Sequence, residues 1–190
     1  MMDIVIPNNN EEEFIAIAHK LGYKTLYFLY NYETYQGKKK NFADIPGIKI
    51  VNGILADGKN LKKIKNKMEE ESVFVAAKSS DKDMEIMEGS LANLIFSFEE
   101  NQRRDFMHQR ASGLNHILCS LARKNDVAIG FSFSSILNAK NTHEILGRIM
   151  QNLRMCRQFK VKTAIASFTK NPYEIRSMHD LKSLFKILEA

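Results

Sequence analysis

The chain has 190 residues, 44% hydrophobic and 26% charged, which is ordinary for a soluble globular protein and fits one domain over residues 1–190. No apolar run approaches the roughly 18 residues of a membrane span, and the first residues lack the basic segment of a signal peptide, so we expect a cytoplasmic protein. The net charge of +6 is uneven, because residues 1–100 carry −3 and residues 101–190 carry +9. A basic half favours a polyanionic partner, although solubility alone also explains it.

Short apolar runs rich in Val, Ile, Phe and Tyr recur along the chain and predict strands. Most are apolar throughout instead of alternating, which is typical of strands buried on both faces. The predicted strands are Asp3–Ile6, Thr25–Tyr30, Ile48–Leu55, Val73–Ala76, Leu94–Phe98, Val127–Phe133 and Thr163–Ser167.

Amphipathic stretches between these runs predict helices. Gly22 is a suitable residue to end the first helix, and Ser112 is a suitable cap for an apolar stripe that extends from Leu114 to Ala122. The predicted helices are Glu11–Leu21, Asn60–Glu71, Asp81–Glu88, the helix after Ser112, Thr142–Phe159 and a last helix after Ser177.

Strand–helix alternation over the whole length predicts a parallel sheet with helical crossovers. About seven strands in this length fit a small α/β barrel of the TIM-like type, and an open doubly wound sheet is the alternative. Cys119 and Cys156 are the two cysteines, and neither belongs to a C-x-x-C pair. A disulfide between them is possible, but buried reduced thiols are the better interpretation for a cytoplasmic protein.

Sequence signatures of catalysis are missing. We find no G-x-G-x-x-G after a strand, no phosphate-binding loop and no G-x-S-x-G elbow. The histidines are scattered, and the strand ends at Pro7–Asn10 and Ser132–Ser135 lack the His and Asp ligands of metal-dependent barrels. We therefore expect neither a catalytic residue nor a metal site in this chain.

Several segments between residues 105 and 190 occur together in a specific order. Ser112-Gly113-Leu114-Asn115 opens a helix, Val127–Ser132 follows as V-x-I-x-F-S, and Arg148–Leu153 reads R-x-x-x-N-L. Ile175–Leu181 is similar to an L-R-S-P-x-D-L ending, with Met178 in place of the proline. Together these segments resemble ribonuclease P protein component 3, the archaeal family related to the eukaryotic 30-kilodalton RNase P subunit.

The resemblance implies a barrel similar to that of the PHP phosphoesterases, with the metal centre lost. It also implies a protein subunit of ribonuclease P, the ribonucleoprotein endonuclease that removes 5′ leaders from precursor tRNA, in which the RNA does the chemistry. The implied partners are the RNase P RNA, a small ferredoxin-like subunit and other RNase P proteins. No cofactor is expected on this chain, and Mg²⁺ is expected with the RNA of the holoenzyme.

A subunit of this kind neutralises phosphates, for which the guanidinium fork of Arg is well suited. We expect the cationic side chains of the second half to gather on one exterior patch. The candidate RNA contacts are Arg103, Arg104, His108, Arg110, Arg148, Arg154, Arg157, Lys160, Lys162, Lys170, Arg176 and Lys182.

Two other functions remain open at this point. A metal-dependent PHP-type phosphoesterase would carry bound Mn or Zn, and a protein scaffold without RNA contact would show no salt-dependent RNA affinity.

Overall fold

The computed structural model describes residues 1–37, 47–59, 61–101, 105, 107 and 110–189. Its strands run parallel in one sheet, in the order in which they occur along the chain. The strands are β1 (Met2–Val5), β2 (Thr25–Asn31), β3 (Lys49–Ala56), β4 (Phe74–Lys78), β5 (Leu94–Phe96), β6 (Ala128–Ser132) and β7 (Thr163–Ala166).

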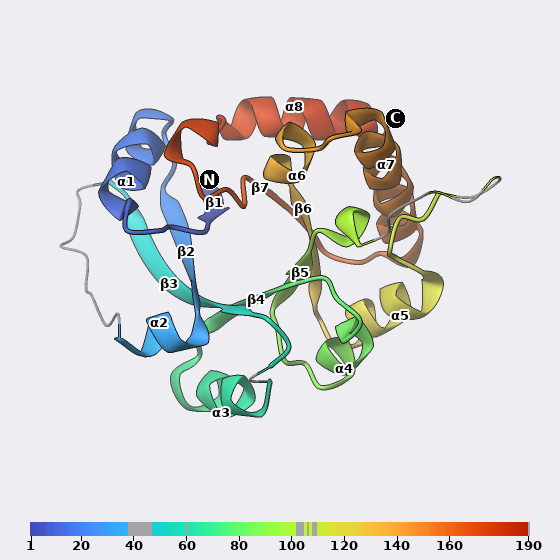
Figure 1. The fold of residues 1–190 in the computed structure, drawn as a ribbon, viewed down its shortest axis with the longest axis horizontal. Helices are drawn as coiled ribbons and strands as arrows, with labels where there is room; N and C mark the ends of the chain where they lie inside the picture. Colours follow the sequence, from blue (N-terminus) through green and yellow to red (C-terminus); the bar gives the residue numbers. More distant parts are fainter. Residues whose placement is uncertain (38–46, 60, 102–104, 106, 108–109, 190) are drawn as a thin grey trace.

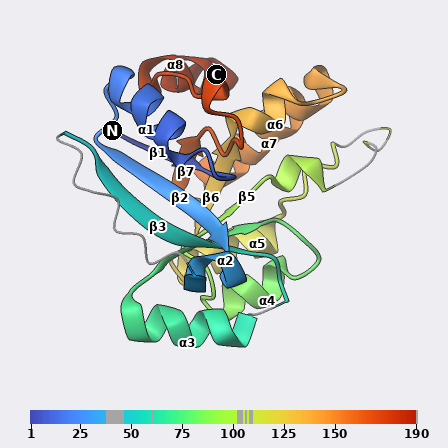
Figure 2. The same cartoon turned by 60° about the vertical axis from the view of Figure 1, so that its left-hand side comes forward.

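The helices surround this sheet as the outer layer of a TIM-like barrel (Figure 1). Turned by 60°, the view still shows α3 and α8 on opposite sides of the sheet (Figure 2). The α-helices are α1 (Glu11–Lys20), α2 (Tyr32–Gly37), α3 (Leu61–Glu71), α4 (Asp83–Glu88), α5 (His116–Lys124), α6 (Phe133–Leu137), α7 (Thr142–Phe159) and α8 (Met178–Leu188), with short 3₁₀ turns at Phe98–Glu100 and Pro172–Glu174. No described helix is long and apolar enough to span a membrane.

The first and last strands approach each other at their carboxyl ends, so the sheet is nearly closed. Phe168 donates its amide to the carbonyl of Ile4 at 2.8 Å, and Ile6 donates to Thr169 at 2.9 Å. The buried carboxylate of Asp3 accepts from both the amide and the hydroxyl of Ser167 at 2.7 Å. This closure favours the barrel over the open doubly wound sheet.

The core explains why the strands are apolar throughout. Side chains such as Leu29 and Phe96 fill the inside of the barrel, while Ile54, Ile95 and Phe131 pack outward against the helices. Both faces of β4, β5 and β6 are therefore largely shielded from water, as the lack of alternation predicted, whereas β3 and β7 are partly exposed. Cys119 and Cys156 are both buried and free, which agrees with two reduced thiols.

Two local predictions were wrong, and two short helices were not predicted. Ser112 is buried and does not cap α5; instead Asn115 accepts from the amide of Leu118 at 2.9 Å, because Gly113 turns the chain at φ +80° before the helix starts. Ile117, placed on the buried stripe, is 47% exposed. The helices α2 and α6 were not predicted, because each follows its strand directly and is too short for a clear hydrophobic period.

Candidate nucleic-acid interface

Asp105, which precedes α5, is held against α7 by an ion pair with a buried arginine. Arg148 donates from Nε to Oδ1 of Asp105 at 2.8 Å, and from Nη1 to the carbonyl of Glu99 at 3.0 Å. The side chain of Arg148 is only 3% exposed. Burial by itself raises the pKa of Asp105, but hydrogen bonds from the amide of Ala111 and from Arg148 outweigh it, and the pKa is lowered.

A second contact from the same face of α7 holds the next part of the segment. Asn152, one turn beyond Arg148, is fully buried and donates to the carbonyl of Ser112 at 2.9 Å. Gly113 lies so close to the neighbouring turn that an added Cβ would be 2.2 Å from the carbonyl oxygen of Phe98. Ser112 and Gly113 of the sequence motif therefore allow the backbone to pack closely against α7 and the turn at Phe98.

Arg110 extends from this fixed segment onto the surface of α7. Its guanidinium lies on Gly147, where an added Cβ would be 1.7 Å from Nη1 of Arg110. The side-chain amide of Gln151 donates a long hydrogen bond of 3.5 Å to the carbonyl of Arg110. Because Gly147 has no side chain, the arginine rests directly on the helix backbone.

Arg154 continues the same side of the helix. It is exposed and follows Gly147 by two helical turns, with Gln151 between them. We refer to Arg110, Gly147, Gln151 and Arg154 as the Arg110–Arg154 face. It presents two guanidinium groups beside polar side chains, which is chemistry suited to phosphates along a nucleic-acid backbone.

Comparison with known proteins identifies the family to which this arrangement belongs. The family model described as RNase P subunit p30 matches residues 1–190. The chain belongs to the RNase P subunit p30 family.

Individual relatives agree with this family assignment. Ribonuclease P protein component 3 of Methanosarcina mazei is 26% identical over 175 residues, which are 89% of this chain and 70% of the relative. The Thermococcus kodakarensis protein of the same name is 35% identical over 74 residues, or 38% of this chain and 34% of the relative. Among solved structures, a chain of an archaeal ribonuclease P with mature tRNA is similar in fold, with a TM-score of 0.72 at 20% identity, covering 100% of this chain and 83% of that chain.

The family assignment confirms the resemblance seen in the sequence, and the barrel confirms the predicted fold class. Among the described residues, no three His, Cys, Asp or Glu side chains are grouped so that they could hold a metal ion. The family model and the named relatives all point to ribonuclease P, so the phosphoesterase alternative is not favoured.

The sequence-based list of RNA contacts needs one correction at Arg148. This side chain is buried in its ion pair with Asp105 and does not reach the surface. The prediction failed because the periodic stripe of α7 does not show that a carboxylate 43 residues earlier packs against the helix. Arg103, Arg104 and His108 lie outside the described residues.

The remaining candidates do not gather on one patch. Lys160 and Lys162 precede β7 and Lys170 follows it, so they lie at opposite ends of the barrel. Lys182 is on α8, where it lines a cavity with Met1 and Met2. The prediction of a single exterior patch is therefore wrong, because these cationic side chains lie in smaller, separate groups.

Two further candidates form exposed ion pairs within the protein. Arg157 pairs with Glu189 at 3.3 Å, and Lys162 pairs with Asp126 at 2.7 Å. Exposed pairs of this kind contribute little to stability.

Arg176 is held more firmly. It donates to the carbonyls of Tyr173 and Ile175 at 3.0 Å and lies over the ring of Phe133. Its position is structural, at the turn before α8.

Sequence reasoning missed the roles of Asp105, Gly147 and Asn152. Asn152 and Arg148 were noted together as R-x-x-x-N-L, but their spacing of four residues was not used. That spacing places both polar side chains on one side of a helix, next to a buried stripe. It is the signal that could have predicted a buried contact between α7 and a distant loop.

Proposed function

We propose that this member of the RNase P subunit p30 family binds the RNA of ribonuclease P through the Arg110–Arg154 face. The observation that carries the proposal is the position of Arg110 on Gly147. The next two residues hold its backbone in place, because Ala111 bonds to Asp105 and Ser112 bonds to Asn152. A guanidinium fixed in advance loses less conformational entropy when it grips a phosphate.

In this proposal the RNA cleaves precursor tRNA, and this chain contributes no reacting group. It acts in the cytoplasm, binds no cofactor itself, and depends on Mg²⁺ only through the RNA. Its protein partners are a small ferredoxin-like subunit and the other RNase P proteins. The family assignment supports the role as a ribonuclease P subunit with RNA and protein partners, and the other statements extend that role.

Reconstituted cleavage tests the proposal. RNase P RNA and the other protein subunits are assembled with the wild-type chain, with Arg110→Ala/Arg154→Ala, or with no chain. Lys65→Ala, an exposed position on α3, serves as the control. We expect the double variant to lose most of the stimulation that the wild type provides and the control to keep it.

Folding of the double variant is checked separately by circular dichroism. Full stimulation by a folded double variant would remove the Arg110–Arg154 face from the RNA contacts. A chain that stimulates cleavage without measurable RNA affinity would favour a protein scaffold instead.

A further inference from the structure

A second polar site lies at the carboxyl ends of the barrel strands, away from α7. A cavity of about 480 Å³ opens between the loops after β1 and β2, with Lys170 from the end of β7 at its border. Its volume falls within the range of small-molecule sites. The carboxyl ends of the strands are also where barrels of this type bind ligands.

The charge of this cavity comes from Lys170. Among the residues that line it, Lys170 is the only charged one, and it is exposed without an ion pair in the described part of the chain. An adjoining cavity contains two carboxylates, but Glu100 pairs with Lys78 at 2.5 Å and Glu174 accepts from Thr169. The ammonium of Lys170 is therefore available to an anion.

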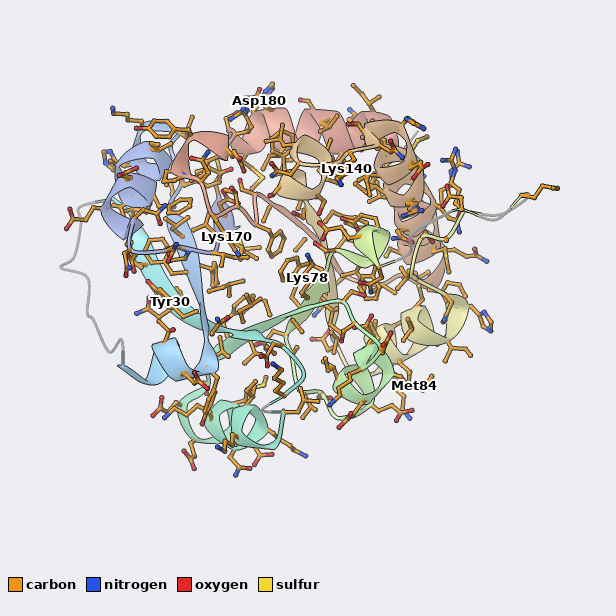
Figure 3. All side chains as sticks on the ribbon, in the orientation of Figure 1. Tyr30, Lys78, Met84, Lys140, Lys170 and Asp180 are labelled. Carbon is orange, nitrogen blue, oxygen red and sulfur yellow. The ribbon has the colours of Figure 1, made fainter. Side chains whose placement is uncertain are left out.

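The backbone around Lys170 is held from both sides. The carbonyl of Lys170 accepts from the side-chain amide of Asn10 at 3.0 Å, and the carbonyl of Thr169 accepts from Ile6 at 2.9 Å. Phe168 adopts φ +47°, an unfavourable value for a bulky residue that the surrounding contacts maintain. Figure 3 shows Lys170 and Lys78 on opposite sides of the barrel centre.

Neutral hydrogen-bonding groups line the rest of the cavity. Asn8 comes from the loop after β1, and Asn31 and Thr34 follow from β2 into α2, all with exposed side chains. Amides and hydroxyls both donate and accept hydrogen bonds, which matches the hydroxyls of a sugar.

We propose that this cavity binds the ribose phosphate of a single nucleotide. The phosphate lies at Lys170, and the ribose hydroxyls meet Asn8, Asn31 and Thr34. The site is separate from the Arg110–Arg154 face and does not depend on the proposed function.

Calorimetric titration of the full chain with adenosine monophosphate (AMP) tests this inference. We expect saturable binding that Lys170→Gln weakens about tenfold, as the loss of one charge-assisted hydrogen bond implies. Lys186→Gln, an exposed lysine on α8, should leave the affinity unchanged. The absence of saturable binding at millimolar AMP, or equal losses in both variants, would overturn the site.

Two further ligands test the ribose part. Ribose 5-phosphate should bind about as well as AMP, and inorganic phosphate should bind more weakly because it lacks the sugar hydroxyls. Equal affinity for inorganic phosphate would contradict a ribose phosphate site. These titrations need no RNase P RNA, so their failure leaves the proposed function untouched.

Discussion

The guanidinium of Arg148 and the carboxylate of Asp105 meet at 2.8 Å, and the same carboxylate oxygen accepts from the amide of Ala111 at 2.9 Å. The pair connects α7 with Ala111, the residue that follows Arg110. A buried arginine that looks like an RNA contact in the sequence thus has a structural role: it holds in place an arginine that is exposed.

Replacing Arg148 should weaken this connection between α7 and Ala111. Arg148→Lys cannot reproduce both donor contacts, so we expect the free energy of unfolding in urea to fall by about 2–4 kcal/mol. Arg154→Lys, on the exposed side of the same helix, should change it by less than about 0.5 kcal/mol. Equal effects of the two substitutions would argue against a structural role for Arg148.

Gly147→Ala should separate RNA binding from stability. The new methyl group displaces the guanidinium of Arg110, while alanine favours the helix by up to about 1 kcal/mol over glycine. We expect unchanged or higher stability together with severalfold weaker RNA binding in a filter-binding assay. Gln158→Ala, farther along α7 from Arg110, provides the control, and unaltered RNA affinity in Gly147→Ala would show that the placement of Arg110 is unimportant.

The Gly113 turn should tolerate no side chain. Gly113→Ala combines φ +80° with a contact of 2.2 Å to the carbonyl of Phe98, so we expect a loss of about 3 kcal/mol or more. Gly22→Ala is a matched control, since Gly22 has φ +75° but no atom within 4 Å of the added carbon. It should cost only about 1 kcal/mol, and similar losses in urea unfolding would contradict the packing argument.

Glu99 should make stability depend on pH. Burial raises its pKa to about 7, from about 4.5 when exposed, so the folded chain keeps a proton that the unfolded chain releases between these values. Stability attributable to this group therefore falls as pH rises through that window. The free energy of unfolding of Glu99→Gln, measured relative to the wild type, should therefore be about 2 kcal/mol more favourable at pH 7.5 than at pH 5. The same difference between variant and wild type at both pH values would show that Glu99 is not the responsible group.

The strands were predictable because each is a short apolar run, most of them shielded on both faces. Helix α7 was predictable because its apolar stripe extends over many turns. Contacts that join distant parts of the chain were not predictable from local patterns. The Asp105–Arg148 pair spans 43 residues, and Lys162 and Lys170 lie close in sequence yet at opposite ends of the barrel. A charge balance over half the chain says nothing about which end of a barrel each cation occupies.

The salt dependence of RNA binding tests the central claim most directly. Affinity for RNase P RNA is measured over a series of salt concentrations for the wild type, Arg110→Ala, Arg154→Ala and the double variant. Log affinity falls linearly with log salt, and each lost phosphate contact should make this fall less steep by about one unit of slope. The slope of the double variant should therefore be less steep by about two. Identical slopes and affinities for the wild type and the double variant would contradict the assignment of the Arg110–Arg154 face to RNA.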